Sequence, residues 1–277
     1  MRTESITSVT GSLTWITESD RTPKENSVNT KDRIIQALEE AKGEYISGER
    51  LAELFDLSRN AIWKGINELK KDGYPITSVR NKGYMLPVSS DMISKAGIGL
   101  ALKERVGEKD AEELLERLYV YETLDSTNTQ AKRQLLIDAF SVTHQTTIVA
   151  RTQSSGRGHR GSAFDSPDGG IYFSMILDPK KVRKPELVSG AVADMVTDMF
   201  EELCKIRVQK KKDHSLYKGN RKVCGILTEA VSDLETGVYS SLIVGIGIRA
   251  EVIAGPADEV PTKNRVIAAL MDKLSNL

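Results

Sequence analysis

Cysteine and long apolar runs are scarce in this chain, and each shortage excludes a class of protein. Two cysteines among 277 residues are too few for a disulfide framework, so a reducing cytoplasm is the expected location. No run approaches the ~18 apolar residues that a membrane helix needs, and the N-terminal segment lacks the apolar core of a signal peptide. Lys plus Arg and Asp plus Glu number 39 each, which excludes a polybasic protein but not a local basic face.

What remains is the composition of a folded globular protein. Apolar residues make up 39% of the chain, and the length suggests two domains. Residues 1–29 are rich in Ser, Thr and charge without a sustained period, which predicts a flexible tail. Residues 30–88 favour short helices and a hairpin, residues 89–118 form a connector, and residues 119–277 alternate strands with helices.

The segment 30–88 has the pattern of a winged helix-turn-helix. Thr30, Ser47 and Ser58 can each cap a helix that carries apolar residues at helical spacing. The elements expected are helices over 30–43, 47–56 and 58–73 and strands over 76–80 and 84–86. In this architecture the third helix enters the major groove of DNA, and the hairpin contacts the DNA backbone or the minor groove.

Cations are concentrated on the third helix and the hairpin. Six cations and two anions lie between Arg59 and Lys82. Cations at such positions can contact phosphates, while polar side chains can contact base edges. We therefore predict DNA as a partner, with protein docking through a solvated basic face as the alternative. The predicted DNA-contacting residues are Ser58, Arg59, Asn60, Lys64, Asn67, Arg80 and Lys82.

From Tyr119 onward the pattern predicts a mixed α+β domain, preceded by a charged helix over 100–118. The strands expected are 119–122, 147–153, 170–177, 205–208, 223–231 and 239–248, and the helices expected are 127–139, 185–204 and 262–275. No P-loop motif appears, and the three histidines lack metal-ligand spacing, so no metal site is predicted.

Several short motifs follow one another in this second region. They are Asp125-Ser126-Thr127-Asn128, Thr152-Gln153-Ser154-Ser155-Gly156-Arg157-Gly158-His159-Arg160-Gly161, Gly170-Ile171-Tyr172-Phe173-Ser174, Lys222-Val223-Cys224-Gly225-Ile226-Leu227-Thr228-Glu229 and Val244-Gly245-Ile246-Gly247-Ile248. In this order and spacing the chain, from about Thr30 to its end, resembles the bifunctional biotin–protein ligase and biotin-operon repressor family. Residues 58–64 of the third helix and Lys82-Gly83-Tyr84 of the hairpin also resemble the family's.

The resemblance implies a biotin/lipoate-ligase-like catalytic domain with the activity of a biotin–[acetyl-CoA-carboxylase] ligase. Such a protein condenses biotin with ATP, in the presence of Mg²⁺, to biotinyl-5′-adenylate. It then passes biotin to a lysine of a biotin carboxyl carrier protein. The resemblance also implies repression of transcription at operator DNA by a homodimer that forms when ligand is bound.

The resemblance also implies where the ligand is held. Ser126, Thr127, Asn128 and Gln153 would hydrogen-bond the ureido ring of biotin. The loop Gly156-Arg157-Gly158-His159-Arg160 would hold the adenylate, because glycines let the backbone approach a phosphate. Arg157 and Arg160 are the catalytic candidates there, since their charges offset that of the phosphate. Gly225 would let a strand lie close against the ligand.

One departure concerns the catalytic lysine. The family's Lys-Trp-Pro-Asn-Asp segment is absent, and Val208–Tyr217 occupies its place. Counting back from Lys222 without a gap puts Lys211 at the position of the family's ligand-contacting lysine. Lys210 and Lys212 are reached by a shift of one residue. A triple-lysine run is usually a solvated turn, but a lysine here would stabilise charge on a transferring acyl-adenylate.

Three further departures keep other readings open. His159 replaces a loop arginine, Arg249 replaces an asparagine, and the chain stops at Leu277, where most relatives continue into a small β-barrel that helps the nucleotide site. The missing barrel brings ATP affinity into question. The alternative is a catalytically impaired, biotin-sensing DNA-binding repressor. A third reading is a regulator whose effector is another small carboxylate, such as a lipoyl or fatty acyl group.

Overall fold

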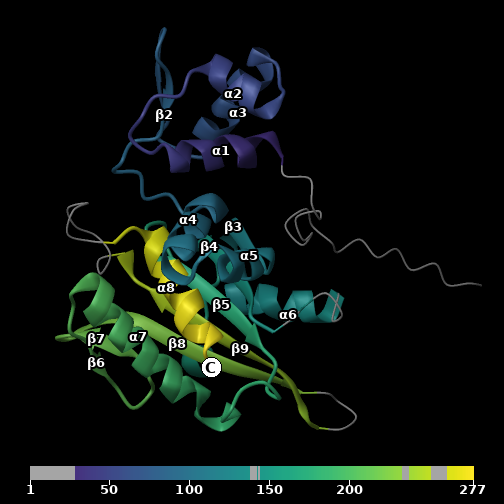
Figure 1. Cartoon of the computed structure of the whole chain (residues 1–277). Coiled ribbons are helices and arrows are strands. Elements are labelled where there is room, and N and C mark those ends of the chain that lie inside the picture. The colour runs from purple at the N-terminus through teal and green to yellow at the C-terminus, as the bar shows by residue number, and fades with distance from the viewer. Residues whose placement is uncertain (1–28, 138–141, 143, 233–236, 251–260) are drawn as a thin grey trace, which may run out of the picture.

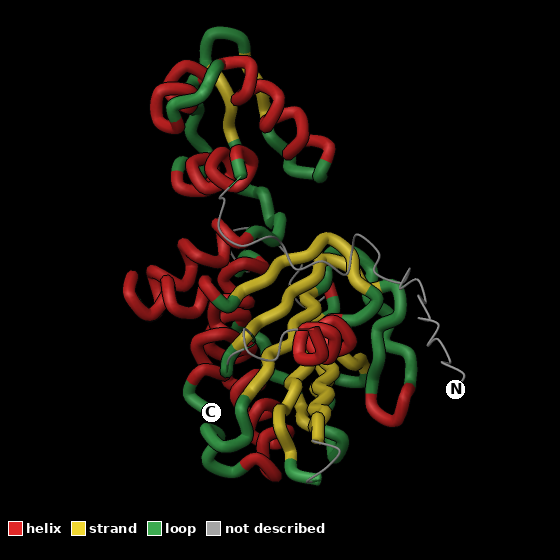
Figure 2. The backbone as a smooth tube through the Cα atoms, turned by 90° about the vertical axis from the view of Figure 1, so that its right-hand side faces the viewer, coloured by secondary structure: helices red, strands yellow, loops and turns green. Residues whose placement is uncertain are grey.

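The described residues form two units, the smaller with one hydrophobic cluster and the larger with two. The computed structural model describes residues 29–137, 142, 144–232, 237–250 and 261–277. One core lies among residues 34–86, and the larger one fills the region from Ile93 to Leu274. Figures 1 and 2 show the smaller unit standing above the larger one, and the described part of the chain passes once from one to the other. The predicted tail, apart from Asn29, lies outside the described residues.

The smaller unit is a winged helix-turn-helix, as predicted. Its elements are α1 (Thr30–Glu40), α2 (Gly48–Phe55), α3 (Arg59–Lys71), β1 (Thr77–Val79) and β2 (Gly83–Met85). Ile34, Leu51 and Ile62 are fully buried where the three helices meet. The segment folds this way because each helix carries apolar residues at i, i+3 and i+4 on the side that faces the other two.

The caps of these helices are mostly those expected. The Ser47 and Ser58 hydroxyls accept the backbone N–H groups of Arg50 and Ala61, at 3.0 and 3.1 Å. The prediction for the first helix was wrong, because Asn29 rather than Thr30 caps it. Asn29 Oδ1 accepts the N–H of Asp32 at 3.0 Å, and Thr30 is the first helical residue.

A connector of two helices follows, where the sequence predicted one helix over 100–118. These helices are α4 (Lys95–Val106) and α5 (Glu108–Glu116). Gly107, at φ +83°, breaks the helix between them. Ser94 caps α4 by accepting the N–H of Gly97 at 2.9 Å. Helix α4 packs against α8 (Lys263–Ser275), which ties the connector to the larger unit.

The described residues of the larger unit contain one seven-stranded sheet in the order β3-β4-β5-β9-β8-β7-β6. Its strands are β3 (Leu118–Leu124), β4 (Thr146–Gln153), β5 (Ile171–Leu177), β6 (Gln209–Lys210), β7 (Leu216–Lys218), β8 (Arg221–Ser232) and β9 (Tyr239–Ile248). Strands β3 and β4 are parallel, and the other neighbours are antiparallel. Together with the winged unit, this confirms the predicted α+β class.

Helices cover both faces of the central strands. Helices α7 (Val188–Cys204), α4 and α8 share one apolar cluster with alternate residues of β5, among them Phe173 and Met175. Ile176, which lies between Met175 and Leu177 on β5, belongs to another cluster beneath α6 (Thr127–Ile137). Because successive side chains of a strand point to opposite faces, α6 lies on the face opposite α7 and α8.

Some predicted elements differ from the structure. Residues 205–208 are not a strand, because Lys205 takes a left-handed conformation at the end of α7 and pairing begins only at Gln209. The lysine run interpreted as a solvated turn begins at the end of β6, and Lys211 and Lys212 lie in the exposed turn between β6 and β7. Residues 185–187 form a short 3-10 helix ahead of α7. The expected end of the helix over 127–139 lies outside the described residues.

Candidate functional site

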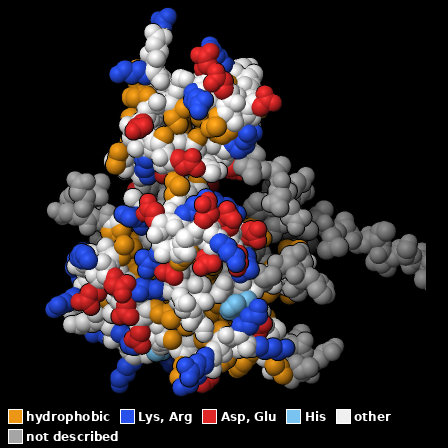
Figure 3. Space-filling view, viewed as in Figure 1, with side chains coloured by type: hydrophobic (Ala, Val, Ile, Leu, Met, Phe, Trp, Pro, Cys, Tyr) orange, Lys and Arg blue, Asp and Glu red, His pale blue; other side chains and the backbone are white. Residues whose placement is uncertain are grey.

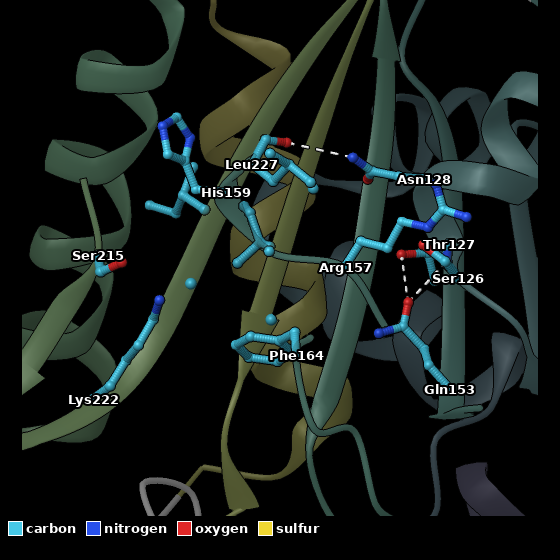
Figure 4. Close-up of a pocket in the computed structure, with 16 residues that line it drawn as sticks. Ser126, Thr127, Asn128, Gln153, Arg157, His159, Phe164, Ser215, Lys222 and Leu227 are labelled. Atoms are coloured by element: carbon cyan, nitrogen blue, oxygen red, sulfur yellow. Dashed lines mark hydrogen bonds between the residues drawn. The ribbon is translucent and has the colours of Figure 1, made fainter. Parts of the chain in front are cut away.

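A pocket on the α6 face of the sheet brings together motifs that are far apart in the sequence. It encloses about 470 Å³ of empty space, part of it open to solvent. Figure 4 shows its walls, with α6 on one side and β8 on the other. The lining residues are Ser126, Thr127, Asn128, Gln153, Arg157, Gly158, His159, Phe164, Ser215, Lys222, Gly225, Ile226, Leu227, Gly245, Ile246 and Gly247.

Three glycines make room for this pocket on neighbouring strands. Gly225 of β8 pairs with Gly247 of β9, and Cβ atoms added to them would lie 2.9 and 2.4 Å from the ring of Phe164. A Cβ on Gly245 would lie 2.3 Å from Asn128 Oδ1. These distances are shorter than real contacts allow. The glycines therefore admit Phe164 and Asn128 to the floor of the pocket.

Hydrogen bonds fix the amide of Gln153 and the start of α6. Gln153 Oε1 accepts the N–H of Thr127 at 2.8 Å, and Gln153 Nε2 donates to Ser166 Oγ at 2.8 Å. The fully buried Ser174 hydroxyl lies 2.7 Å from Thr127 Oγ1 and 2.6 Å from Asn128 Oδ1. The polar wall is therefore oriented before any ligand arrives, which lowers the cost of ordering it.

Asn128 is held from its other end by an ion pair. Its Nδ2 donates to Glu229 Oε2 at 2.8 Å, and the other oxygen of Glu229 accepts Lys132 Nζ at 2.6 Å. Burial raises the pKa of Glu229. The hydrogen bonds from Lys132 and Asn128 outweigh burial and hold the pKa below its usual value. A carboxylate anchored in this way keeps the oxygen of the Asn128 amide directed at Ser174.

The turn before α6 is locked by a second ion pair. Arg133 donates to both oxygens of Asp125, at 3.0 and 2.6 Å. Burial raises the pKa of Asp125, but the bonds from Arg133 and from the backbone of Ser126 hold it below its usual value. This geometry presents the buried Ser126 to the pocket. The Asp-Ser-Thr-Asn motif thus supplies both a turn and a pocket wall.

The glycine-arginine loop turns back on itself beside the pocket. Gly158 N–H donates to Ser162 O at 2.7 Å, and Phe164 N–H donates to Gly156 O at 2.9 Å. Gly156 is needed for this close approach, because a Cβ there would lie 2.3 Å from Phe164 O. Arg157, Gly158 and His159 line the pocket, whereas the predicted residues Gly156 and Arg160 are not part of the lining.

The structure does not bring the three predicted lysines to the pocket. Lys210 pairs with Asp194 of α7, and the ammonium of Lys211 lies 5.6 Å from the centre of the Tyr217 ring. Lys212 is exposed. Lys222 lines the pocket instead. Lys222 stands three residues before Gly225 in the Lys222–Glu229 motif. That position could have indicated a pocket residue, but the count back from Lys222 to Lys211 did not use it.

Phe164 and Ser215 also line the pocket without having been predicted. Phe164 follows the glycine-arginine loop, and only the glycines on two distant strands indicate that it folds inward. Ser215 is buried three residues after the lysine run. Figure 4 shows Ser215 and the end of Lys222 on the wall opposite Asn128 and Thr127.

The predicted DNA-contacting residues lie on α3 and the hairpin. Arg59, Asn60, Lys64, Arg80 and Lys82 are exposed, and Asn67 is half-buried. Ser58 is exposed, and its hydroxyl caps the helix. Figure 3 shows Lys or Arg side chains at the end of the hairpin that tops the molecule. Trp63, 58% exposed, was missed, although it lies four residues after Arg59 and off the apolar stripe.

Contacts around these cations set their orientation. Arg59 pairs with Glu49 of α2, and Lys70 Nζ donates to Ser78 Oγ of the hairpin at 2.7 Å. The Lys82 ammonium lies 5.7 Å from the centre of the Tyr45 ring. The Lys70 bond joins α3 to the hairpin, and both elements carry exposed cations of the kind that contacts DNA phosphates.

Other chemistries find little support in the described part of the chain. It holds no group of three or more His, Cys, Asp or Glu side chains that could bind a metal ion. None of its helices is long and apolar enough to cross a membrane. Burial raises the pKa of Cys204 to about 11 and that of Cys224 to about 12, so both thiols stay protonated and unreactive at neutral pH.

Comparisons with known proteins agree with both units. A helix-turn-helix domain model matches residues 30–85, and a biotin/lipoate A/B protein ligase family model matches residues 120–248. The bifunctional ligase/repressor BirA of Bacillus spizizenii is 28% identical over 87% of this chain and 70% of that protein. BirA of Escherichia coli is 32% identical over 81% of this chain and 64% of that protein.

A third relative, BirA of Bacillus subtilis, is 31% identical over 78% of this chain and 63% of that protein. The chain thus spans about two thirds of the length of these relatives. Among solved structures, a biotin protein ligase from Aquifex aeolicus in complex with biotin and ATP is 26% identical. That match covers 57% of this chain and 68% of that one, with a TM-score of 0.45.

The fold and the pocket together define a class: a small-molecule-binding α+β unit that carries a winged-helix DNA-binding unit at its N-terminal side. The helix-turn-helix match precedes the ligase-family match along the chain. The chain carries a helix-turn-helix domain followed by a domain that matches the biotin/lipoate A/B protein ligase family, and it is similar to bifunctional ligase/repressors over both.

Proposed function

We propose that this protein condenses biotin with MgATP to biotinyl-5′-adenylate and transfers biotin to a lysine of a carrier protein. The observation that carries the proposal is the pocket, which gathers Ser126, Thr127 and Asn128 with Gln153 and the glycine-arginine loop. Hydroxyls and amides there suit the polar ureido ring, while Phe164 and Leu227 offer apolar surface to the rest of biotin. Arg157 supplies charge for the phosphate.

The chemistry needs water kept away from the reactive mixed anhydride. The glycine-arginine loop borders the pocket, and Arg157 and His159 are exposed on it. Closure of the loop over the adenylate would exclude water and bring both side chains to the phosphate. Mg²⁺ enters as part of the MgATP substrate, since Mg²⁺ is commonly held by substrate phosphates with few protein ligands.

The second part of the proposal is repression of transcription. Arg59, Lys64 and Lys82 face outward on α3 and the hairpin, where the major groove and the phosphates of operator DNA would lie. Bound adenylate would favour a homodimer, and the dimer would fit an operator with two half-sites. We place both activities in the cytoplasm.

The test is single-turnover formation of biotinyl-adenylate by the purified chain with biotin, Mg²⁺ and labelled ATP. Adenylate that co-elutes with the protein is the expected result. Saturable biotin binding without any adenylate would instead favour the biotin-sensing repressor. The position of Lys211 outside the pocket is the observation that supports this second candidate. Failure to bind biotin would contradict both and point to another small carboxylate.

A further inference from the structure

Trp63 is an exposed aromatic residue on α3. It is 58% exposed, and among the described residues none accepts a hydrogen bond from its indole N–H group. Tryptophan offers a large apolar area to a partner, together with one N–H donor at the edge of the ring. More than half of that area is left for a partner from outside the described part of the chain.

The indole belongs to the exposed face of α3. Ile62 and Ile66 of the same helix are buried in the core of the winged-helix unit. The exposed residues recur at i, i+1, i+4, i+5 and i+12, which is the spacing of one helix face. They are Arg59, Asn60, Trp63, Lys64 and Lys71. Every exposed residue of α3 other than the tryptophan is therefore a cation or an amide.

The charge of this face favours DNA over protein as the partner. The face carries three cations and no carboxylate, and the exposed Arg80 and Lys82 of the hairpin add two more cations. The ion pair between Arg59 and Glu49 of α2 offsets one of them. The core of a protein interface is depleted of charge, whereas DNA meets cations at its phosphates and polar or apolar groups at its bases. An indole beside cations and an amide has the second pattern.

The chemistry of the bases indicates what the indole would meet. A helix-turn-helix of the kind that residues 30–85 match lays its second helix in the major groove, and that helix is α3 here. The C5-methyl group of thymine is the apolar group that base pairs display in this groove. The neutral indole has no charge to offer a phosphate, so its apolar surface matches the methyl group.

We propose that Trp63 selects thymine at one position of the operator by covering its C5-methyl group in the major groove. The inference rests on the DNA-binding part of the proposed function, and it adds a residue that supplies sequence preference there. Arg59 and Lys64, its neighbours on the same face, carry the charge for phosphates. Trp63 contributes apolar contact and determines specificity.

The experiment begins with the operator. The full chain, with biotin and MgATP, selects it from a pool of duplexes with a randomised core. Trp63→Ala and Leu136→Ala are run in parallel. Leu136→Ala is the matched control, because Leu136 is an apolar residue of α6 in the larger unit and is 85% exposed. We expect wild type and Leu136→Ala to select the same sequence, and Trp63→Ala to lose the preference for thymine at one position.

Removal of one methyl group then tests the contact itself. The selected duplex is remade with deoxyuridine in place of that thymine, which removes only the C5-methyl group from the base. We expect wild-type protein to bind the deoxyuridine duplex about fourfold less tightly, the effect of one buried methyl group. Trp63→Ala should bind the two duplexes with equal affinity. Fluorescence anisotropy measures both.

The salt dependence of binding separates an apolar contact from a displaced helix. Trp63→Ala removes no charge, so the slope of its log affinity against log salt should equal that of wild type. A lower slope would overturn the inference, because the ring would then hold α3 in place rather than contact a base. If Trp63→Ala does not unfold cooperatively, Trp63→Gln takes its place, since glutamine is a good helix former.

Wild-type protein that binds the thymine and deoxyuridine duplexes equally, or Trp63→Ala that still distinguishes them, would overturn the inference and leave DNA binding standing. A change of oligomeric state in Trp63→Ala, with its sequence preference intact, would show that a second copy covers the ring instead. A wild-type chain that enriches no duplex from the pool overturns the proposed repression itself, and the inference with it.

Discussion

The winged-helix unit and the pocket differ in how far apart along the sequence their contacting residues lie. In the winged-helix unit each helix is capped by a local contact, as where Ser58 accepts the N–H of Ala61 three residues on. In the pocket, Asn128 meets Glu229 across 101 positions of the sequence, and Gln153 meets Thr127 across 26. A change in the first region should act on the surface of one helix. A substitution in the pocket should alter contacts on several strands at once.

Asn128→Ala should have the largest effect. It removes one of the two partners of the Ser174 hydroxyl and one of the two partners of Glu229. Loss of a hydrogen bond to a charged group costs about 1.5–3 kcal/mol, so we expect biotin affinity to fall about 100-fold. Isothermal titration with biotin measures it.

The matched control is Asn60→Ala on α3, an exposed asparagine. It should leave biotin affinity unchanged and weaken DNA binding. Equal biotin affinity in the two variants would show that the network beneath the pocket has no part in ligand binding.

Lys64→Ala should have the next largest effect, and on DNA alone. An exposed lysine on α3 that contacts a phosphate contributes about one unit to the slope of log affinity against log salt. We expect binding to a duplex to weaken about tenfold at low salt and the slope to fall by about 1. Fluorescence anisotropy over a salt series measures both, with Lys109→Ala on α5 as a control far from the hairpin. An unchanged slope would mean that Lys64 does not lie at a phosphate.

Arg151 connects the two regions and tests whether they act separately. Arg151 lies on β4, two residues before Gln153. Its guanidinium donates to the carbonyl of Asp72, at the end of α3, at 3.0 Å and to the carbonyl of Ile93 at 3.2 Å. It also lies 5.2 Å from the centre of the Tyr74 ring. Arg151→Met removes these bonds.

Without them the recognition helix is held less firmly against the sheet. We expect DNA affinity in the presence of biotin and ATP to fall about threefold to fivefold, and biotin affinity to stay the same. A variant with wild-type DNA binding would show that the orientation of the winged-helix unit does not depend on this arginine.

The difference between local and distant contacts also explains how well the sequence predicts each region. The helices of the winged unit were predictable because caps and apolar spacing are local signals, and only the choice between Asn29 and Thr30 failed. Strands β8 and β9 were predictable from apolar runs. Strand β7 was not, because Leu216–Lys218 is too short for an alternating pattern and follows a lysine run.

The pocket was predictable as a set of motifs but not as a geometry. Phe164 occupies space above Gly225 and Gly247, a relation that exists only after two distant strands pair. Counting residues led to Lys211, whose ammonium lies 5.6 Å from the centre of the Tyr217 ring and is not part of the pocket lining. A count gives a position along the chain but not where the side chain ends.

Ser58 gives the smallest effect and the sharpest test of a local role. Its hydroxyl caps α3, and its exposed position was also predicted to meet DNA. Ser58→Ala should lower the free energy of unfolding by about 1 kcal/mol, as seen by chemical denaturation. Ser58→Asp should keep the cap, because aspartate accepts the same N–H group and its charge suits a helix N-terminus. Near phosphates, however, the new charge would weaken DNA binding. If Ser58→Asp is as stable as wild type but binds DNA less tightly, Ser58 has both roles. If its DNA affinity is unchanged, the residue acts on the helix alone, and DNA contact begins at Arg59.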